Sequence, residues 1–202
     1  SIINSLSLSK NHIKENMTMD DLKKAEEKLN KLADRDVRIV YLPPATVAAY
    51  QYEGDDPEMH VHQVVNRFVL ENNLIMIKPD LRHYGFNAPN PVDETNLHGY
   101  EMWITIPDDF PVPEPLVKKH FDGGLYAAHM IPFGAFDEWG WLSEWVANNP
   151  KYEGNSGNKG YECMWGCLEE SLNYVNRVKM ENPEDDSFQL DLLHPIKEKK
   201  TK

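Results

Sequence analysis

Two short acidic segments could supply the charge of a binding or catalytic site. In HGYEMWITIP, residues 98–107, Glu101 interrupts a run of residues that favour β-structure. Because strand side chains alternate between faces, Glu101 shares its face with Trp103, while Tyr100 lies on the other, apolar face. A carboxylate on an apolar surface must be exposed, paired with a base, protonated, or kept for a ligand. A solvent-facing glutamate is the simpler alternative.

The second acidic segment is CLEESLNY, which contains Glu169 and Glu170. If this segment is a strand, the two side chains point to opposite faces, and one of them must look inward. If it is a helix, both carboxylates can be solvated. The residues alone leave open which glutamate would face a pocket.

Aromatic residues could complete such a site. Three of the five tryptophans lie in AFDEWGWLSEWV, which has the pattern of a helix. Trp141 and Trp145 are one turn apart and can share a face, whereas Trp139 points elsewhere. Flat aromatic surfaces beside carboxylates are what the binding of an organic cation requires, although tryptophans at helical spacing also serve as core.

No metal or cofactor is expected. His60 and His62 are two residues apart, without a carboxylate at a zinc-like spacing. Cys163 and Cys167 have a C-x-x-x-C spacing, which is typical of neither redox nor zinc sites. The common phosphate-binding, dinucleotide-binding and hydrolase motifs are also missing.

The composition limits the partners and the compartment. The chain of 202 residues has a net charge of −12, which argues against nucleic acid as a direct partner. It has no apolar run of 18 residues, so we expect no membrane partner. Unpaired thiols and the lack of a signal peptide favour a cytoplasmic protein.

The pattern of elements predicts two regions. Residues 1–35 form a polar tail and a helix from Thr18 to Asp34, which is either a linker to a further module or a helix docked on the domain, and residues 36–202 form one domain. The chain starts without methionine, which predicts a further module before residue 1. Within the domain the order β-α-β-β occurs twice, so we expect an α+β fold with an antiparallel sheet and helices on one face. The predicted segments are 37–52, 59–74, 82–91 (a short strand running into a Pro-rich turn) and 98–109 in the first half, and 118–132, 135–149, 166–175 and 188–197 in the second.

Several of these segments resemble the gyrase-inhibitor-like effector-binding domain. The resemblance rests on YEMWITIPDD, on HFDGGLYAAHMIPFGAFDEWGWLSEWV, on LEESLN and on FQLDLLHPIK, in this order and spacing. It covers the chain from about Asp36 to the C-terminus. The family includes the ligand-binding halves of bacterial multidrug-responsive transcription activators, which are attached to MerR-type or AraC-type DNA-binding modules.

The resemblance implies a pseudo-twofold pair of β-α-β-β units with a ligand pocket between them. It also implies aromatic walls and a buried glutamate that attracts lipophilic cations, and Glu169 matches that glutamate. Ser171 stands where the family has an aromatic residue, and Gln189 stands where it has a second carboxylate, which weakens the expected preference for cations. With the helices on one face, we expect the pocket on the free face that carries Glu101, and alternation then excludes Tyr100. The candidate ligand-binding residues are Glu169, Glu101, Trp103, Tyr126, Trp141, Trp145, Glu170 and Phe86.

The predicted function is the effector sensor of a bacterial transcription regulator, which binds a drug-like, amphipathic compound, either cationic or neutral. Its expected partners are a small organic ligand, DNA through a separate N-terminal module only, and a second copy of the chain. The alternative is an enzyme, because some standalone members of the family hydrolyse cyclopropane-bearing electrophiles with a pocket glutamate and a tyrosine. Glu169 and Tyr126 would be the matching residues here.

Overall fold

The computed structural model describes residues 19, 36–184 and 187–201. The predicted linker helix from Thr18 to Asp34 lies outside the described residues except for residue 19. The domain boundary at residue 36 therefore stays a prediction. Within the described part of the chain, every helix is too short or too polar to cross a lipid bilayer.

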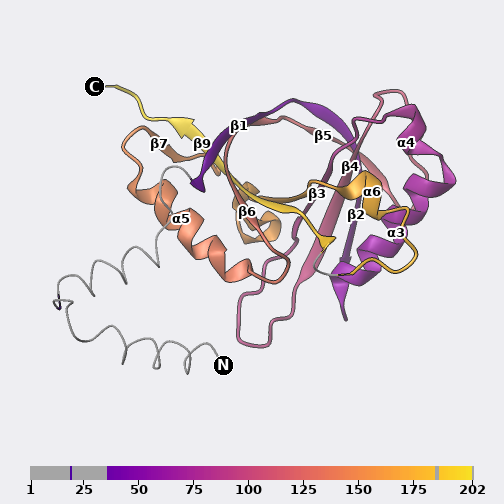
Figure 1. The fold of residues 1–202 in the computed structure, drawn as a ribbon, viewed down its shortest axis with the longest axis horizontal. Coiled ribbons are helices and arrows are strands. Elements are labelled where there is room, and N and C mark those ends of the chain that lie inside the picture. The colour runs from indigo at the N-terminus through magenta and orange to yellow at the C-terminus, as the bar shows by residue number, and fades with distance from the viewer. Residues whose placement is uncertain (1–18, 20–35, 185–186, 202) are drawn as a thin grey trace.

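The described chain folds into two halves with matching element order (Figure 1). Each half contributes two strands, a main helix and two further strands of the main sheet, and the second half adds the short strand β7. The first half comprises β1 (Arg38–Leu42), β2 (Ala45–Glu53), α3 (Pro57–Glu71), α4 (Leu74–Ile77), β3 (His83–Asn87) and β4 (Gly99–Ile106). The second half comprises β5 (Val117–Phe121), β6 (Gly124–Ile131), η2 (Phe136–Glu138), α5 (Trp139–Asn148), β7 (Tyr152–Gly154), η3 (Tyr161–Gly166), β8 (Leu168–Ser171), α6 (Tyr174–Arg177) and β9 (Leu190–Glu198).

The strand order is symmetric about the middle of the sheet. Among the described residues, eight strands follow the order β1-β6-β9-β8-β3-β4-β2-β5, and the short β7 pairs with β9. All pairs are antiparallel. The third strands of the two halves, β3 and β8, meet in the centre, and the first strands are exchanged, so that β1 joins β6 and β5 joins β2. The predicted duplicated α+β fold is confirmed, and residues 168–171 are a strand.

The exchange of first strands brings two connections into close contact. The link after β1 passes directly over Gly123 in the link between β5 and β6. A Cβ atom at Gly123 would lie 2.2 Å from the carbonyl oxygen of Leu42, and the φ angle of Gly123 is +66°. Only glycine combines this left-handed backbone with such a close approach. Gly123 lies in the stretch HFDGGLYAAHM, one of those on which the resemblance rests, and its type there has this structural cause.

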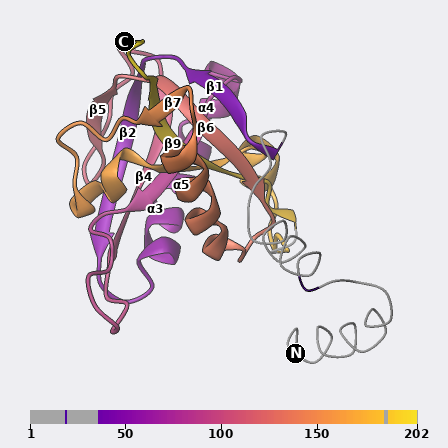
Figure 2. The same cartoon turned by 90° about the vertical axis from the view of Figure 1, so that its left-hand side faces the viewer.

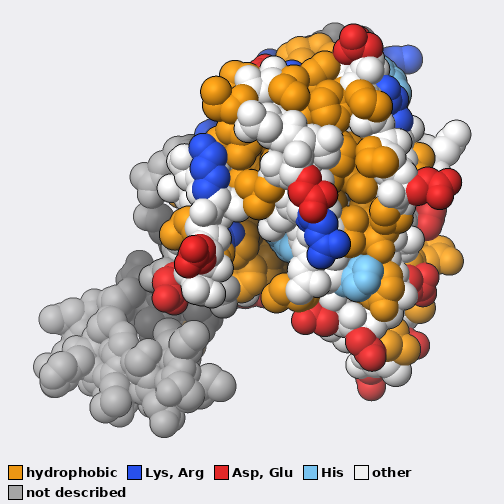
Figure 3. Space-filling view, turned by 90° about the vertical axis from the view of Figure 1, so that its right-hand side faces the viewer, with side chains coloured by type: hydrophobic (Ala, Val, Ile, Leu, Met, Phe, Trp, Pro, Cys, Tyr) orange, Lys and Arg blue, Asp and Glu red, His pale blue; other side chains and the backbone are white. Residues whose placement is uncertain are grey.

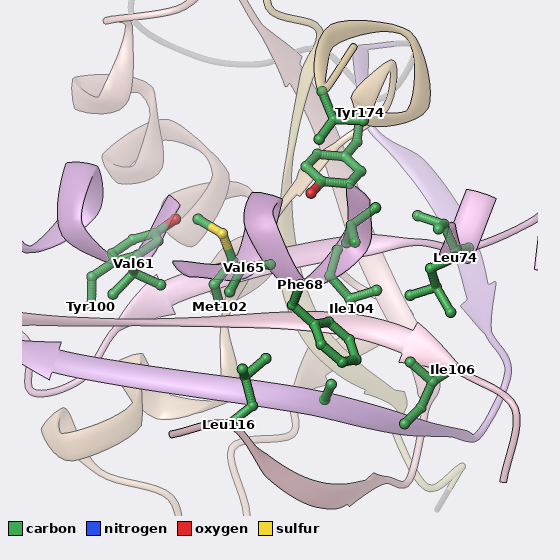
Figure 4. Close-up of a cluster of buried hydrophobic side chains, with 14 residues drawn as sticks. Val61, Val65, Phe68, Leu74, Tyr100, Met102, Ile104, Ile106, Leu116 and Tyr174 are labelled. Atoms are coloured by element: carbon green, nitrogen blue, oxygen red, sulfur yellow. The ribbon is translucent and has the colours of Figure 1, made fainter. Parts of the chain in front are cut away.

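Helices α3 and α5 cover the same face of the sheet, as Figure 2 shows from the α5 end. Pro57 begins α3, and Val61, Val65 and Phe68 recur at helical spacing and are buried. They pack on the even-numbered side chains of β4, such as Met102, as Figure 4 shows. A separate cluster that includes Leu142 and Val146 forms beneath α5. The space between the two helices is where the two halves meet.

The opposite face of the sheet is concave and holds a third core. Its side chains come from both halves and include Tyr84 and Phe86 from β3, and Phe121 and Tyr126 from β5 and β6. Tyr84 lies 5.4 Å from Phe121 between ring centroids, and Phe121 lies 6.4 Å from Tyr126. This face is filled by packed side chains.

Replacing Gly123 with alanine should destabilise the fold. The new methyl group would meet the Leu42 carbonyl in a backbone conformation that alanine disfavours. We expect the free energy of unfolding to fall by about 2–4 kcal/mol, measured by urea denaturation. The control is Gly140→Ala in α5, where an added Cβ meets no atom within 4 Å. That variant should be as stable as the parent or more stable. An unchanged urea midpoint for Gly123→Ala would show that the crossing is not tight.

Candidate functional site

A cavity of about 830 Å³ lies on the helix-bearing face, between α3 and α5. Its floor is formed by β4, β3 and β8, so both halves contribute to it. The cavity is lined by carboxylates, imidazoles, amides, sulfur-containing side chains and aromatic rings. The lining residues are Asp56, Glu58, Met59, His62, His83, Asn87, Asn90, Asn96, His98, Tyr100, Phe133, Phe136, Trp139, Ser143, Met164, Trp165, Cys167, Glu169, Ser171, Phe188 and Leu190.

Glu169 is the carboxylate on the floor of this cavity. Tyr100 Oη donates a hydrogen bond to Glu169 Oε2 over 2.9 Å, and Trp139 Nε1 donates to Oε1 over 3.4 Å. Burial raises the pKa of Glu169 to about 7, although the two hydrogen bonds act in the opposite direction. No lysine or arginine of the described chain forms a salt bridge with Glu169. The carboxyl is therefore partly protonated at neutral pH and is left without a cation.

A glycine in the intervening strand lets Tyr100 reach Glu169. Tyr100 lies on β4 and Glu169 on β8, with β3 between them. Gly85 on β3 is paired with Glu169, and a Cβ atom there would lie 2.2 Å from Tyr100 Oη. The phenol can cross β3 only because that position has no side chain. Burial also raises the pKa of Tyr100 well above its usual value, so Tyr100 acts as a hydrogen-bond donor.

The rim of the cavity carries a second carboxylate. Glu58, in the first turn of α3, accepts a hydrogen bond from His98 Nε2 over 2.6 Å. Partial burial lowers the pKa of His98, but its hydrogen bonds to the Asn96 carbonyl and to Glu58 outweigh this and raise it. The raised pKa favours the imidazolium form of His98, which pairs with the Glu58 carboxylate. Asp56 also lines the cavity but is exposed to water, so Glu169 is the half-buried carboxylate of the lining that no described residue pairs in a salt bridge.

The aromatic wall comes from the second half of the chain. Trp139 begins α5, Phe136 lies in η2 directly before it, and Trp165 belongs to η3. Phe133 stacks on Phe188, with 4.9 Å between ring centroids. Trp165 is 47% exposed, so a large apolar surface is open to the cavity mouth.

Four predicted site residues lie on the concave face, away from the cavity. Glu101 is buried there and accepts hydrogen bonds from Trp103 Nε1 at 2.7 Å and from Lys119 Nζ at 2.6 Å. Trp103, Phe86 and Tyr126 belong to the packed core of that face. The expectation that the face without helices holds the pocket was wrong, because the curled sheet fills that face with its own side chains.

Glu170 has a structural partner instead of a place in the cavity. Arg82 binds both of its carboxylate oxygens at 2.7 Å on the concave face. The strand at 168–171 thus separates the two glutamates as alternation requires, with Glu169 in the cavity. Trp141 and Trp145 also lie outside the lining, and Trp145 packs on the core beneath α5. Trp139 lines the cavity in their place.

Sequence reasoning missed Tyr100, Trp139, Glu58 and the histidines of the lining. Tyr100 was excluded because the helices were expected to cover its face completely. The helices cover the two ends of that face and leave the middle open. Tyr100 and Glu169 both point to the helix-bearing face of the sheet. A pocket placed between the helices would therefore have included both of them. Among the described residues, no group of three or more His, Cys, Asp or Glu could hold a metal ion.

A family model for integron-associated effector binding proteins, Cass2, matches residues 38–196. The chain belongs to this family. The predicted resemblance to the gyrase-inhibitor-like effector-binding domain is confirmed in the same comparison and in the fold. No curated protein matches the chain.

Solved structures share the fold at low sequence identity. EcmrR in its DNA complex has a TM-score of 0.59 and 9% identity over 88% of this chain and 63% of that chain. The EcmrR C-terminal domain alone has a TM-score of 0.55 and 9% identity over 80% of this chain and 96% of that chain. A hydrolase from Listeria innocua has a TM-score of 0.55 and 14% identity over 86% of this chain and 98% of that chain. The chain thus spans about 63% of EcmrR in that complex and matches its C-terminal domain.

Glu169 should make the stability of the fold depend on pH. With a pKa of about 7 in the folded chain and an ordinary value of 4.5, the folded state holds a proton that the unfolded state has released between these pH values. Stability from Glu169 is therefore present at low pH and is lost as the pH rises to about 7. The free energy of unfolding of the parent minus that of Glu169→Gln should fall by roughly 2–3 kcal/mol between pH 5 and pH 8.

The prediction concerns the difference between parent and variant because His62 and His83 also titrate. Their lowered pKa values make the free energy of unfolding rise with pH, in the opposite direction to Glu169. Glu144, exposed on α5, provides the control. The parent minus Glu144→Gln should show no such slope in urea denaturation at several pH values. A flat difference for Glu169→Gln would mean that Glu169 is ionised in the folded chain.

Proposed function

We propose that the cavity binds an amphipathic organic cation and that the chain is the effector sensor of a bacterial transcription regulator. The observation that carries the proposal is the position of Glu169: a carboxylate on the floor of a large, aromatic-walled cavity, held by neutral donors only. A ligand cation would supply the missing charge. The family to which the chain belongs, of effector-binding proteins, supports this assignment.

Binding and ionisation of Glu169 are coupled. Burial favours the neutral acid, whereas a cation in the cavity favours the carboxylate. A bound cation would therefore displace the proton, and Trp139 and Phe136 would provide faces for its apolar groups. Acidic side chains are also scattered over hydrophobic surface on the face in Figure 3, in agreement with the net charge of −12. This field favours the approach of cations.

DNA binding would reside in a separate module before residue 1. The likeness to both EcmrR in its DNA complex and its isolated C-terminal domain supports this arrangement. The acidic charge of this chain also disfavours direct contact with phosphates. A second copy of the chain stays a predicted partner, and a cytoplasmic location stays a prediction as well.

Tetraphenylphosphonium, a cation that does not titrate, tests the proposal. Its affinity, measured by isothermal titration calorimetry, should increase as the pH rises from 6 to 8, because Glu169 loses its proton over that range. Glu169→Gln should weaken binding by about 1–3 kcal/mol at pH 8 and remove the pH dependence. Neutral triphenylphosphine oxide, of similar shape, should not gain affinity with pH.

The matched control is Glu101→Gln. Glu101 lies on the concave face beside Lys119, so its replacement should leave the binding of tetraphenylphosphonium unchanged. Equal losses in the two variants would point to a general effect of charge. The absence of binding to the parent chain would reject the cation-binding function.

A second candidate is hydrolysis of a cyclopropane-bearing electrophile. The hydrogen bond between Tyr100 and Glu169 favours it, because a phenol beside a carboxylate can assist a base or nucleophile. Tyr100 takes the role that the sequence assigned to Tyr126, which lies in the concave core. Ring-opened product, detected by mass spectrometry and lost in both Glu169→Gln and Tyr100→Phe, would support an enzyme. Binding without product supports the sensor.

A further inference from the structure

Two asparagines lie beside Tyr100 and Glu169 on the floor of the cavity. Asn87 ends β3 and is paired with Tyr100 on β4, so their Cβ atoms are about 4.5–5.5 Å apart on the same face of the sheet. Asn90 follows in the connection between β3 and β4. Both asparagine side chains are half-buried, and both line the cavity.

The side chains around Asn87 on this face of the sheet line the cavity too. Tyr100 lies opposite Asn87 on β4, and the register that pairs Gly85 with Glu169 brings Cys167 to its other side. Tyr100, Cys167 and Glu169 are all lining residues. The amide of Asn87 therefore faces the cavity, on the helix-bearing side of the sheet.

The two amides are linked by one hydrogen bond, which leaves polar atoms available. Asn87 Nδ2 donates to Asn90 Oδ1 over 2.9 Å, and no described residue pairs with Asn87 Oδ1 or Asn90 Nδ2. Both of these atoms are accessible to solvent, because the side-chain nitrogens and oxygens of the described chain that are both buried and unpaired belong to His83 alone. The amide pair therefore presents one free acceptor and one free donor. Exchange of oxygen and nitrogen in both amides would leave the same two kinds of group free.

Segment η3 holds the amide pair in position. The backbone N–H of Asn87 donates to Met164 Sδ over 3.3 Å, and that of Asn90 donates to the Tyr161 carbonyl over 2.8 Å. Met164 is buried, so this contact is shielded from water. A polar pair whose backbone is already ordered loses less conformational entropy when it binds a ligand.

The sheet sets the distance between the amide pair and the carboxylate. Gly85 is paired with Glu169, and Asn87 follows Gly85 by two residues on the same face. Asn87 and Glu169 are therefore diagonal neighbours, about 7–8 Å apart along the floor. A single drug-sized molecule in a cavity of about 830 Å³ can contact both.

We propose that the amide pair of Asn87 and Asn90 is a second polar subsite, which binds a neutral group that has both a donor and an acceptor, such as a carboxamide. The inference rests on the proposed function and specifies its ligand class: an amphipathic cation that carries a carboxamide-like group close to its charge. Such a group satisfies both free atoms of the pair at once. A purely aromatic cation that displaces water from the pair leaves both atoms without partners, which is unfavourable.

Two probes of nearly equal shape and charge test the subsite. They are (3-carbamoylphenyl)triphenylphosphonium and (3-acetylphenyl)triphenylphosphonium, titrated into the full 202-residue chain at pH 8. The second probe has a methyl group in place of the amide nitrogen and so lacks the donor. The carboxamide should bind about tenfold more tightly, as expected for hydrogen bonds to groups that are shielded from water. In Asn87→Leu and in Asn90→Leu, which remove an amide at similar side-chain volume, the ratio of the two affinities should fall towards one.

Two further variants separate the causes. Glu169→Gln should weaken both probes by a similar factor and so preserve their ratio. Asn148→Leu is the matched control, because Asn148 is exposed on α5 and does not line the cavity, and its ratio should equal that of the parent. If neither Asn87→Leu nor Asn90→Leu folds, nuclear Overhauser contacts in the parent provide the measurement. The carboxamide protons of the probe should then show contacts to the side-chain amide protons of the two asparagines, and their absence would overturn the subsite.

The outcomes distinguish this inference from the function on which it rests. Equal affinities of the two probes for the parent chain would overturn the subsite but leave cation binding intact. A ratio that persists in both Asn87→Leu and Asn90→Leu would also overturn it, as would binding of tetraphenylphosphonium but of neither substituted probe. Failure of all three cations to bind the parent would reject the proposed function itself.

Discussion

In the described part of the chain, two residue pairs connect β3 to β8 at the centre of the sheet, and the site depends on their register. Tyr84 faces Glu170 and Gly85 faces Glu169 across the β3–β8 junction. A shift of one residue would move Glu169 to the concave face and turn Glu170 into the cavity. The salt bridge from Arg82, on β3's N-terminal flank, to Glu170 fixes the register on one face. The Tyr100 phenol, which crosses Gly85 to reach Glu169, fixes it on the other.

Adjacent glutamates thus have opposite electrostatic roles. Glu170 is buried with a guanidinium on both oxygens, and this pairing offsets the cost of removing its charge from water. Glu169 has only a phenol and an indole as donors, and its raised pKa shows that the cost of its ionisation is not offset. An uncompensated carboxylate lowers the stability of the free chain and leaves a strong attraction for a ligand. Functional sites commonly keep such a group, which is unfavourable for the stability of the fold but favourable for binding.

The sequence predicted what depends on neighbours along the chain. The helical spacing of Val61, Val65 and Phe68 predicted α3. Once residues 168–171 are assigned to a strand, alternation places Glu169 and Glu170 on opposite faces. The sequence could not predict the exchange of β1 and β5, because those pairings join residues 68 to 90 positions apart. That exchange curls the sheet and fills the concave face. The error about Glu101 followed directly, since alternation shows which side chains share a face but not which face stays open.

The cavity also explains why a duplicated fold suits an effector domain. Glu58 and His62 come from α3 in the first half, whereas Trp139 and Phe136 come from the second half. A ligand that contacts both groups binds with a free energy that depends on how the two halves are placed. By linkage, such a ligand favours the placement that it binds best, in proportion to the difference in affinity. A cavity within one half would lack this coupling, because its walls would keep their geometry whatever the position of the other half.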